Sequence, residues 1–246
     1  MQHEIARKLL QLNKEFYART ATDFSRSRHT AQPGVRRVFK NISPQAKVLD
    51  LGCGNGTFRL ALHAADYQGE YLGIDQDLSL LADARFKSTQ AGAHPAQLVC
   101  ADLSDLQWPL VKEQQFEVIT CFAMLHHIPS LDLQQFFFNQ ISHLLKPNGF
   151  FYLSVWQLRN SPKLKARLQP WDSIGIDPKV MAENDLLMDW RAQEQTGQPA
   201  LRYVHEFTSS ELAALGNQAA LSLKDEFYSD GKTGDLALYQ VWQKLS

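Results

Sequence analysis

Apolar residues recur along this chain with two different periods. In the first segment they return every three or four positions, which predicts an amphipathic helix over residues 1–19 whose apolar face is formed by Ile5, Leu9, Leu12 and Phe16. A second, shorter helix is predicted over 33–41, because Pro33 is suited to a first helical turn. The chain therefore begins with a helical segment, residues 1–45.

From residue 46 the pattern changes to short apolar runs rich in β-branched and aromatic residues. These runs are bounded by Gly, Asp or Pro, and they occupy 46–52, 69–75, 96–102, 116–122 and 149–156. Runs of this kind are typical of buried parallel strands. Helical stretches lie between them, including TFRLALHAA, LSLLADARFKS and LQQFFFNQISHLL. The alternation predicts a doubly wound α/β sheet over a core of residues 46–155.

The alternation of short apolar runs and helical stretches stops over residues 156–200, which are rich in Pro, Gln, Asp and Lys. We predict a partly helical insertion there, after the fifth strand. In the C-terminal segment, 201–246, Thr208 and Glu211 form a capping-box pattern ahead of a helix, and two strands follow at about 221–228 and 236–243. The whole chain is thus expected to be one domain with a mostly parallel, Rossmann-like, seven-stranded sheet.

Composition places the chain among folded globular proteins. It has 246 residues, of which 44% are hydrophobic and 21% charged. Cys53, Cys100 and Cys121 are too few and too widely spaced to indicate a disulfide framework or a zinc cluster. No signal peptide or membrane-length apolar run is present, so we expect a soluble, cytoplasmic protein without a membrane partner.

The formal net charge of −1 gives no general indication of nucleic-acid binding, which would need a local basic patch. Two basic clusters exist, one between residues 19 and 40 and one comprising Arg159, Lys163, Lys165 and Arg167. Either cluster is equally compatible with an ordinary solvated face.

The most specific motif is a glycine loop that follows the first strand and opens a helix. Gly52, Gly54 and Gly56 follow Asp50 in the order D-L-G-C-G-N-G, whereas a dinucleotide fingerprint needs a third glycine at position 57, which is Thr. The acidic residue before the loop suits a cationic amino-acid group better than a pyrophosphate.

Two further acids end the next two strands. Asp75 is placed to accept the hydroxyls of a ribose, and Asp102 to bind an adenine amino group with Leu103 as apolar cover. Each could instead cap the helix that follows it. Three acids at three successive strand ends favour a single nucleoside site.

With the segment Phe122–His127 after the fourth strand, these motifs resemble the class I S-adenosylmethionine (SAM)-dependent methyltransferases. The resemblance implies SAM as the cofactor and no metal. It implies a SAM-contacting set that comprises Tyr17, Arg28, Asp50, Gly52, Gly54, Asn55, Gly56, Asp75, Gln76, Asp102, Leu103, Phe122 and Leu125.

The flanks carry a narrower resemblance. F-S-R-S-R-H-T at 24–30, the pair His126-His127, and R-Y-V-H-E-F at 202–207 are similar to segments of the tRNA wobble-uridine methyltransferases that esterify 5-carboxymethyluridine. Ser27 and Gln32 depart from that family's pattern, and its C-terminal G-N-W is absent. The resemblance implies a tRNA anticodon loop as the partner and a small activating protein subunit as a further one.

A carboxylate acceptor arrives already ionised, so the site needs cations and positioning more than a strong base. We assign catalytic roles to Arg28 and Arg202 as bidentate clamps on the acceptor, and to His127 for orienting it. The N-terminal segment, through Tyr17 and Arg28, is expected to fold over the cofactor as a lid.

Two other functions remain open from the sequence. The chain could methylate a small carboxylic acid or natural product, because fold and cofactor site do not choose the acceptor. It could also be a non-catalytic subunit with this fold, although an intact glycine loop and all three acids argue against that.

Overall fold

The computed structural model describes residues 1–27, 29–105, 108, 115–190 and 199–246. Its main unit is a seven-stranded sheet in the order β3-β2-β1-β4-β5-β10-β9. The strands are β1 (Val48–Leu51), β2 (Tyr71–Asp75), β3 (Gln97–Cys100), β4 (Phe116–Phe122), β5 (Leu145–Trp156), β9 (Leu221–Ser229) and β10 (Ala237–Lys244). β1 to β5 run parallel, and β10 pairs antiparallel with both β5 and β9. The predicted doubly wound, mostly parallel sheet is confirmed.

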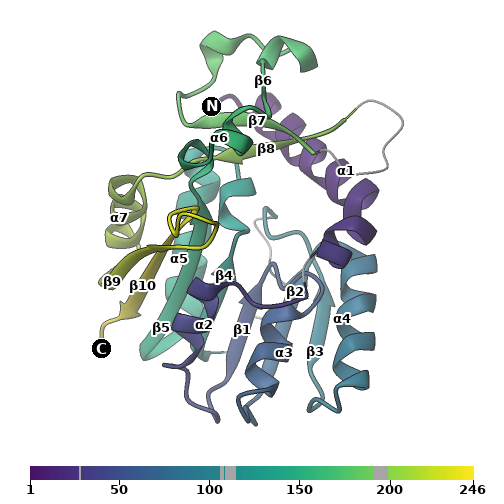
Figure 1. Ribbon diagram of the computed structural model, residues 1–246. Helices are drawn as coiled ribbons and strands as arrows, with labels where there is room; N and C mark the ends of the chain where they lie inside the picture. The colour runs from purple at the N-terminus through teal and green to yellow at the C-terminus, as the bar shows by residue number, and fades with distance from the viewer. Residues whose placement is uncertain (28, 106–107, 109–114, 191–198) are drawn as a thin grey trace.

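Helices cover both faces of this sheet (Figure 1). They are α2 (Pro33–Phe39), α3 (Thr57–His63), α4 (Leu78–Gln90), α5 (Leu131–Leu144) and α7 (Ser209–Gln218). One apolar layer joins the strands to α5 and α7 and includes Phe137, Phe138 and Trp242, all fully buried. The other layer joins β1 to α2 and α3. The predicted capping box of α7 is present, with Thr208 and Glu211 bonded reciprocally.

The insertion contains a second sheet that the sequence did not predict. β7 (Asp185–Trp190) pairs antiparallel with β6 (Leu168–Gln169) and with β8 (Ala200–His205). Short helical pieces precede β7, namely α6 (Pro162–Lys165) and 3₁₀ turns at Leu158–Asn160, Trp171–Ile174 and Pro178–Val180. β8 belongs to the segment expected to start the C-terminal part, so the insertion and that segment form one layer.

Helix α1 (His3–Ser27) extends beyond its predicted end at residue 19. It packs along β8 and reaches α4, so it lies across the side of the molecule where β1 to β4 end (Figure 1). Leu9 of α1 is fully buried against Ile176 and Tyr203, which shows that its apolar face meets the small sheet. Within the described ranges, no helix is long and apolar enough to cross a membrane.

Candidate cofactor and acceptor site

The glycine loop between β1 and α3 is shaped by backbone that other residues do not readily adopt. Gly52 has φ +73°, and a Cβ there would lie 2.6 Å from Cγ of Met124. Gly56, with φ +75°, caps the start of α3. Positive φ costs glycine little, so the loop turns sharply and leaves its surface free of side chains. This is the requirement that the G-x-G-x-G spacing indicated.

Asp50 lies under this loop and is buried. Its carboxylate accepts hydrogen bonds from the hydroxyl of Tyr71 at 2.5 Å and from that of Thr120 at 2.7 Å. Burial raises the pKa of Asp50 to about 6, against the opposing effect of the two hydroxyl donors. The carboxylate is therefore held in one orientation at the end of β1.

Asp75, at the end of β2, is hydrogen-bonded to the glycine loop. One of its carboxylate oxygens accepts from the amide of Gly54 at 2.9 Å, and the other accepts from the amide of Asp77 at 2.9 Å. Burial raises its pKa to about 6 as well. Both oxygens are thus oriented by backbone donors, beside the cavity that Asp75 lines with Gln76.

Asp102 and Leu103 complete this end of the site. Asp102 is exposed and accepts hydrogen bonds from the amide and hydroxyl of Ser104, at 2.9 and 2.6 Å. Leu103 is buried, and both residues line the same cavity as Asp75. Asp102 therefore orders the turn after β3, as a helix-cap residue would, while it faces the cavity.

Two adjoining cavities meet at the glycine loop. The first, of about 150 Å³, is lined by Asp75, Asp102 and Leu103, with Leu10, Asn13 and Tyr17 of α1 also in its lining. The second, of about 130 Å³, is lined by polar residues that include Asp50 and Asn55. Both share Gly52, Gly54, Phe122, Ala123 and Trp156. Together they form one site, with Asp75 and Asp102 at one end and Asp50 and Asn55 at the other.

Helix α1 is bonded to this site at three points. Asn13 accepts from the amide of Tyr203 at 2.7 Å and donates to the carbonyls of Tyr203 and His127, each at 3.2 Å. The Tyr17 hydroxyl lies 2.7 Å from Nε2 of His127. Asn55 donates to the Ser25 hydroxyl at 2.9 Å. The helix therefore lies over the glycine loop and the first cavity, as a lid would.

His127 is a neutral histidine in this environment. Its Nδ1 lies 3.0 Å from the carbonyl of Tyr203, an acceptor, so Nδ1 carries the proton and Nε2 accepts from Tyr17. Burial and the nearby charge of Arg202 lower the pKa of His127 to about 3. A histidine with so low a pKa is a weak base, although its ring lines the first cavity.

Arg202 lies in a third cavity, of about 210 Å³, next to the second one. Its guanidinium carbon is 4.4 Å from the ring centre of Trp156, 4.9 Å from Phe16 and 5.5 Å from Trp190. Arg202 is buried, and Trp156 lines all three cavities. Stacking on aromatic faces holds a cation in an otherwise apolar space.

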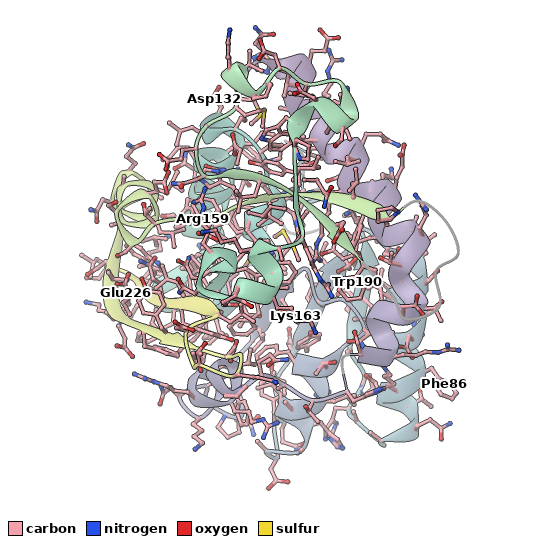
Figure 2. All side chains as sticks on the ribbon, turned by 45° about the horizontal axis from the view of Figure 1, so that its top comes forward. Phe86, Asp132, Arg159, Lys163, Trp190 and Glu226 are labelled. Carbon is pink, nitrogen blue, oxygen red and sulfur yellow. The ribbon has the colours of Figure 1, made fainter. Side chains whose placement is uncertain are left out.

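Trp190 also lines the third cavity. Its Nε1 is buried and has no hydrogen-bond partner in the part of the chain that the structure describes. The residue ends β7, next to α1, as Figure 2 shows.

Most of the residues assigned from the sequence therefore line one of the three cavities. Leu125 is fully buried in the core and lines none of the three cavities, whereas its neighbour Met124 lines the first. Arg28 lies outside the described residues. His126 stacks on Trp156 at 4.4 Å between ring centres, within the protein interior.

Sequence reasoning missed several lining residues, among them Gln32, Trp156 and Asp230. Trp156 ends β5, and a large aromatic residue at a strand end was the available signal. Asp230 accepts from the amide of Gly34 at 2.9 Å and from the hydroxyl of Tyr239 at 2.6 Å, and these hydrogen bonds hold the β9–β10 turn against α2.

No cluster of His, Cys, Asp and Glu within the described ranges is arranged to hold a metal ion.

Comparison with known proteins agrees with this geometry. Residues 48–149 match the family model described as a methyltransferase domain. The chain is 24% identical over 149 residues to the mouse tRNA (carboxymethyluridine(34)-5-O)-methyltransferase ALKBH8, an alignment that covers 61% of this chain and 20% of that protein. It is 34% identical over 114 residues to the ubiquinone biosynthesis O-methyltransferase of Histophilus somni, with 45% of each chain covered. The chain thus matches less than half the length of either relative.

Solved structures show the same fold. The Burkholderia thailandensis 1,6-didemethyltoxoflavin-N1-methyltransferase, solved with its acceptor and S-adenosylhomocysteine, matches with a TM-score of 0.66 at 19% identity, covering 100% of this chain and 91% of that one. The fold is that of the class I methyltransferases. With the family match and the cavities, it supports a SAM-dependent methyltransferase with S-adenosylmethionine as its cofactor.

Proposed function

We propose that this chain transfers a methyl group from SAM to a carboxylate, and that this carboxylate belongs to 5-carboxymethyluridine at the wobble position of a tRNA. One observation carries the proposal: the buried Arg202 lies in a cavity that adjoins the cofactor cavities through Trp156. The acceptor's anion is placed against that cation.

The cofactor fits the two cavities at the glycine loop. The end with Asp75 and Leu103 suits an adenosine, and the end with Asp50 and Asn55 suits an amino acid. A side chain at position 52 would collide with Met124, which lines the first cavity. When bound, SAM supplies a methyl group on a positively charged sulfur, and a carboxylate oxygen displaces that sulfur to give a methyl ester without any proton transfer.

The state of His127 favours a carboxylate over a hydroxyl acceptor. A hydroxyl must lose a proton during transfer, so it needs a base with a pKa near the working pH. His127 has a pKa of about 3 and its Nε2 is already bonded to Tyr17, so it is poorly suited to that task. A carboxylate needs only to be held, and we assign to Arg202 the holding and to His127 the fixing of the lid residue Tyr17.

The tRNA assignment draws on the flanking segments. The stretch 202–207, which resembles the wobble-uridine enzymes, supplies Arg202 to the third cavity and the Tyr203 carbonyl to His127. The mouse relative is named for methylation at carboxymethyluridine 34. An unpaired anticodon base can leave its stack and enter such a cavity, where Trp156 and Trp190 offer aromatic surfaces.

A small carboxylic acid is the second candidate acceptor. The relative from Histophilus somni is a ubiquinone biosynthesis O-methyltransferase, and a cavity of about 210 Å³ accommodates a small molecule as well as a base. Here too Arg202 would bind the anion, so the cavity alone does not choose between the two acceptors.

The test compares methyl transfer from labelled SAM to tRNA bearing 5-carboxymethyluridine, to unmodified tRNA and to a panel of small carboxylic acids. We expect incorporation only into the carboxymethylated tRNA. Incorporation into the small acids alone would support the second candidate. A SAM-binding protein that methylates nothing, even when cell extract supplies an activating subunit, would support a non-catalytic role and overturn the proposal.

A further inference from the structure

The short helix α6 (Pro162–Lys165) contributes to two surfaces at once. Leu164 and the following Arg167 line the third cavity together with Arg202 and Trp190. Lys163 and Lys165 of the same segment are exposed. The wall of the acceptor cavity therefore continues outward into a cationic surface, which we call the α6 surface and define as Lys163, Lys165 and Arg167.

The cations of the α6 surface form no ion pair with an acid in the part of the chain that the structure describes. Among the described residues, none of the three side chains has an ion pair within 4.0 Å. Arg159, the fourth member of this basic cluster in the sequence, behaves differently: it donates to the Asn184 side chain at 3.0 Å and lies 3.5 Å from the Glu206 carboxylate. The cluster thus divides into one structural cation, two exposed lysines, and the half-buried Arg167, which lines the third cavity.

The position of this surface is fixed by the fold. The Arg159 amide donates to the Glu206 carboxylate at 3.0 Å, and the Ser161 hydroxyl caps α6 by accepting from the amide of Leu164. Figure 2 shows Lys163 on the same face of the molecule as Trp190. A cationic surface that adjoins a cavity wall suits a ligand whose reactive group enters the cavity and whose negative charges stay outside.

We propose that the α6 surface binds backbone phosphates of the single-stranded RNA loop that carries the methyl acceptor. This inference rests on the proposed function, because it takes the nucleotide in the third cavity as its starting point. Lysine ammonium groups suit phosphates as mobile point charges, and they give affinity without reading the base sequence. A free small acid would make no use of cations outside the cavity.

The experiment compares the double variant Lys163→Ala/Lys165→Ala with the control Lys179→Ala/Lys224→Ala. The control removes the same charge from exposed lysines outside both basic clusters, in the 3₁₀ turn Pro178–Val180 and on β9. Both variants are assayed with carboxymethylated tRNA over a range of salt concentrations, and with the free nucleoside 5-carboxymethyluridine.

We expect the α6 variant to raise the KM for tRNA several-fold and to reduce the salt dependence of tRNA binding by about 0.7 in the log–log slope for each phosphate that the variant no longer neutralises. Its activity on the free nucleoside should equal that of the unaltered protein, and the control should change neither. Equal tRNA kinetics in the α6 variant and the control would overturn this inference and leave the proposed function standing. Failure of the unaltered protein to methylate both tRNA and nucleoside would overturn the proposed function, and this inference with it.

Discussion

The hydroxyl of Tyr17 lies 2.7 Å from Nε2 of His127, and this contact joins helix α1 to the turn after β4. Both residues line the first cavity. Because Nδ1 of His127 is bonded to the Tyr203 carbonyl, one imidazole ring connects the N-terminal helix to the small sheet. Helix α1, the first cavity and strand β8, which carries Arg202, are therefore linked through one side chain.

Replacing Tyr17 by Phe removes the hydroxyl and leaves the buried Nε2 of His127 without its donor. An unsatisfied buried acceptor costs about 1 to 3 kcal/mol, so we expect SAM affinity to fall by roughly ten-fold as α1 loosens over the cavity. Calorimetry measures this directly. Tyr228→Phe, which changes an exposed tyrosine on β9, should leave the affinity unaltered. Equal SAM affinities in the two variants would show that the Tyr17 hydroxyl does not contribute to SAM binding.

Replacing Asn13 by Ala removes three hydrogen bonds that hold α1 to β8 and to the His127 turn. We expect the free energy of unfolding to fall by about 1 to 3 kcal/mol, and α1 to become more sensitive to protease in the absence of cofactor. Lys14→Ala is the matched control, since Lys14 is the exposed neighbour on the same helix. Protease protection of α1 that is identical in both variants would contradict the assigned role of Asn13.

Binding of SAM should depend on pH through Asp75, whose pKa burial raises to about 6. An ionised carboxylate accepts hydrogen bonds from ribose hydroxyls better than a protonated one, so affinity should be constant above pH 7 and decline as pH falls through 6. In the free protein the sign is opposite, because a raised carboxyl pKa favours folding at low pH, and this contribution is lost as pH rises through 6.

The variant Asp75→Asn tests this dependence. It should weaken SAM binding at pH 8 by about 1 to 3 kcal/mol and flatten the decline between pH 7 and 5. Asp50 also has a raised pKa of about 6, so Asp50→Asn serves as the comparison for the part of the decline that Asp75 does not cause. A full decline that persists in Asp75→Asn would exclude Asp75 as its origin.

Replacing Arg202 by Lys keeps the charge but removes the planar guanidinium that stacks on Trp156. We expect turnover on a carboxylate acceptor to fall by at least about ten-fold, because a point charge does not reproduce two parallel hydrogen bonds. Affinity for SAM should stay nearly intact, since Arg202 lines the third cavity and not the first two. Arg85→Lys, on the exposed face of α4, is the control. Unchanged turnover in Arg202→Lys would contradict the assignment of Arg202 to acceptor binding.

The sheet was predictable because local pattern and tertiary position agree there. Each buried parallel strand is a short apolar run, and the acids Asp50 and Asp75 fall at strand ends whatever the rest of the chain does. The glycine loop was predictable for a similar reason, since Gly52 and Gly56 need positive φ. These features are set by neighbours in the sequence.

The third cavity was harder to predict because distant segments form it. Trp190 and Arg202 come from neighbouring strands of a sheet that joins the insertion to the C-terminal segment, and their cavity is completed by Trp156 of the main sheet. Strand β6 has only two residues, too few for a periodic signal. The narrower resemblance singled out Arg202, but only the fold shows what surrounds it.

The chemical nature of the transferred group tests the central claim most directly. The protein is incubated with labelled SAM and tRNA bearing 5-carboxymethyluridine, and the tRNA is then digested to nucleosides for mass spectrometry before and after mild alkali. Transfer to a carboxylate produces a methyl ester, so we expect label only in 5-methoxycarbonylmethyluridine and its complete loss after alkali. Label that resists alkali, or that resides in any other nucleoside, would contradict the account.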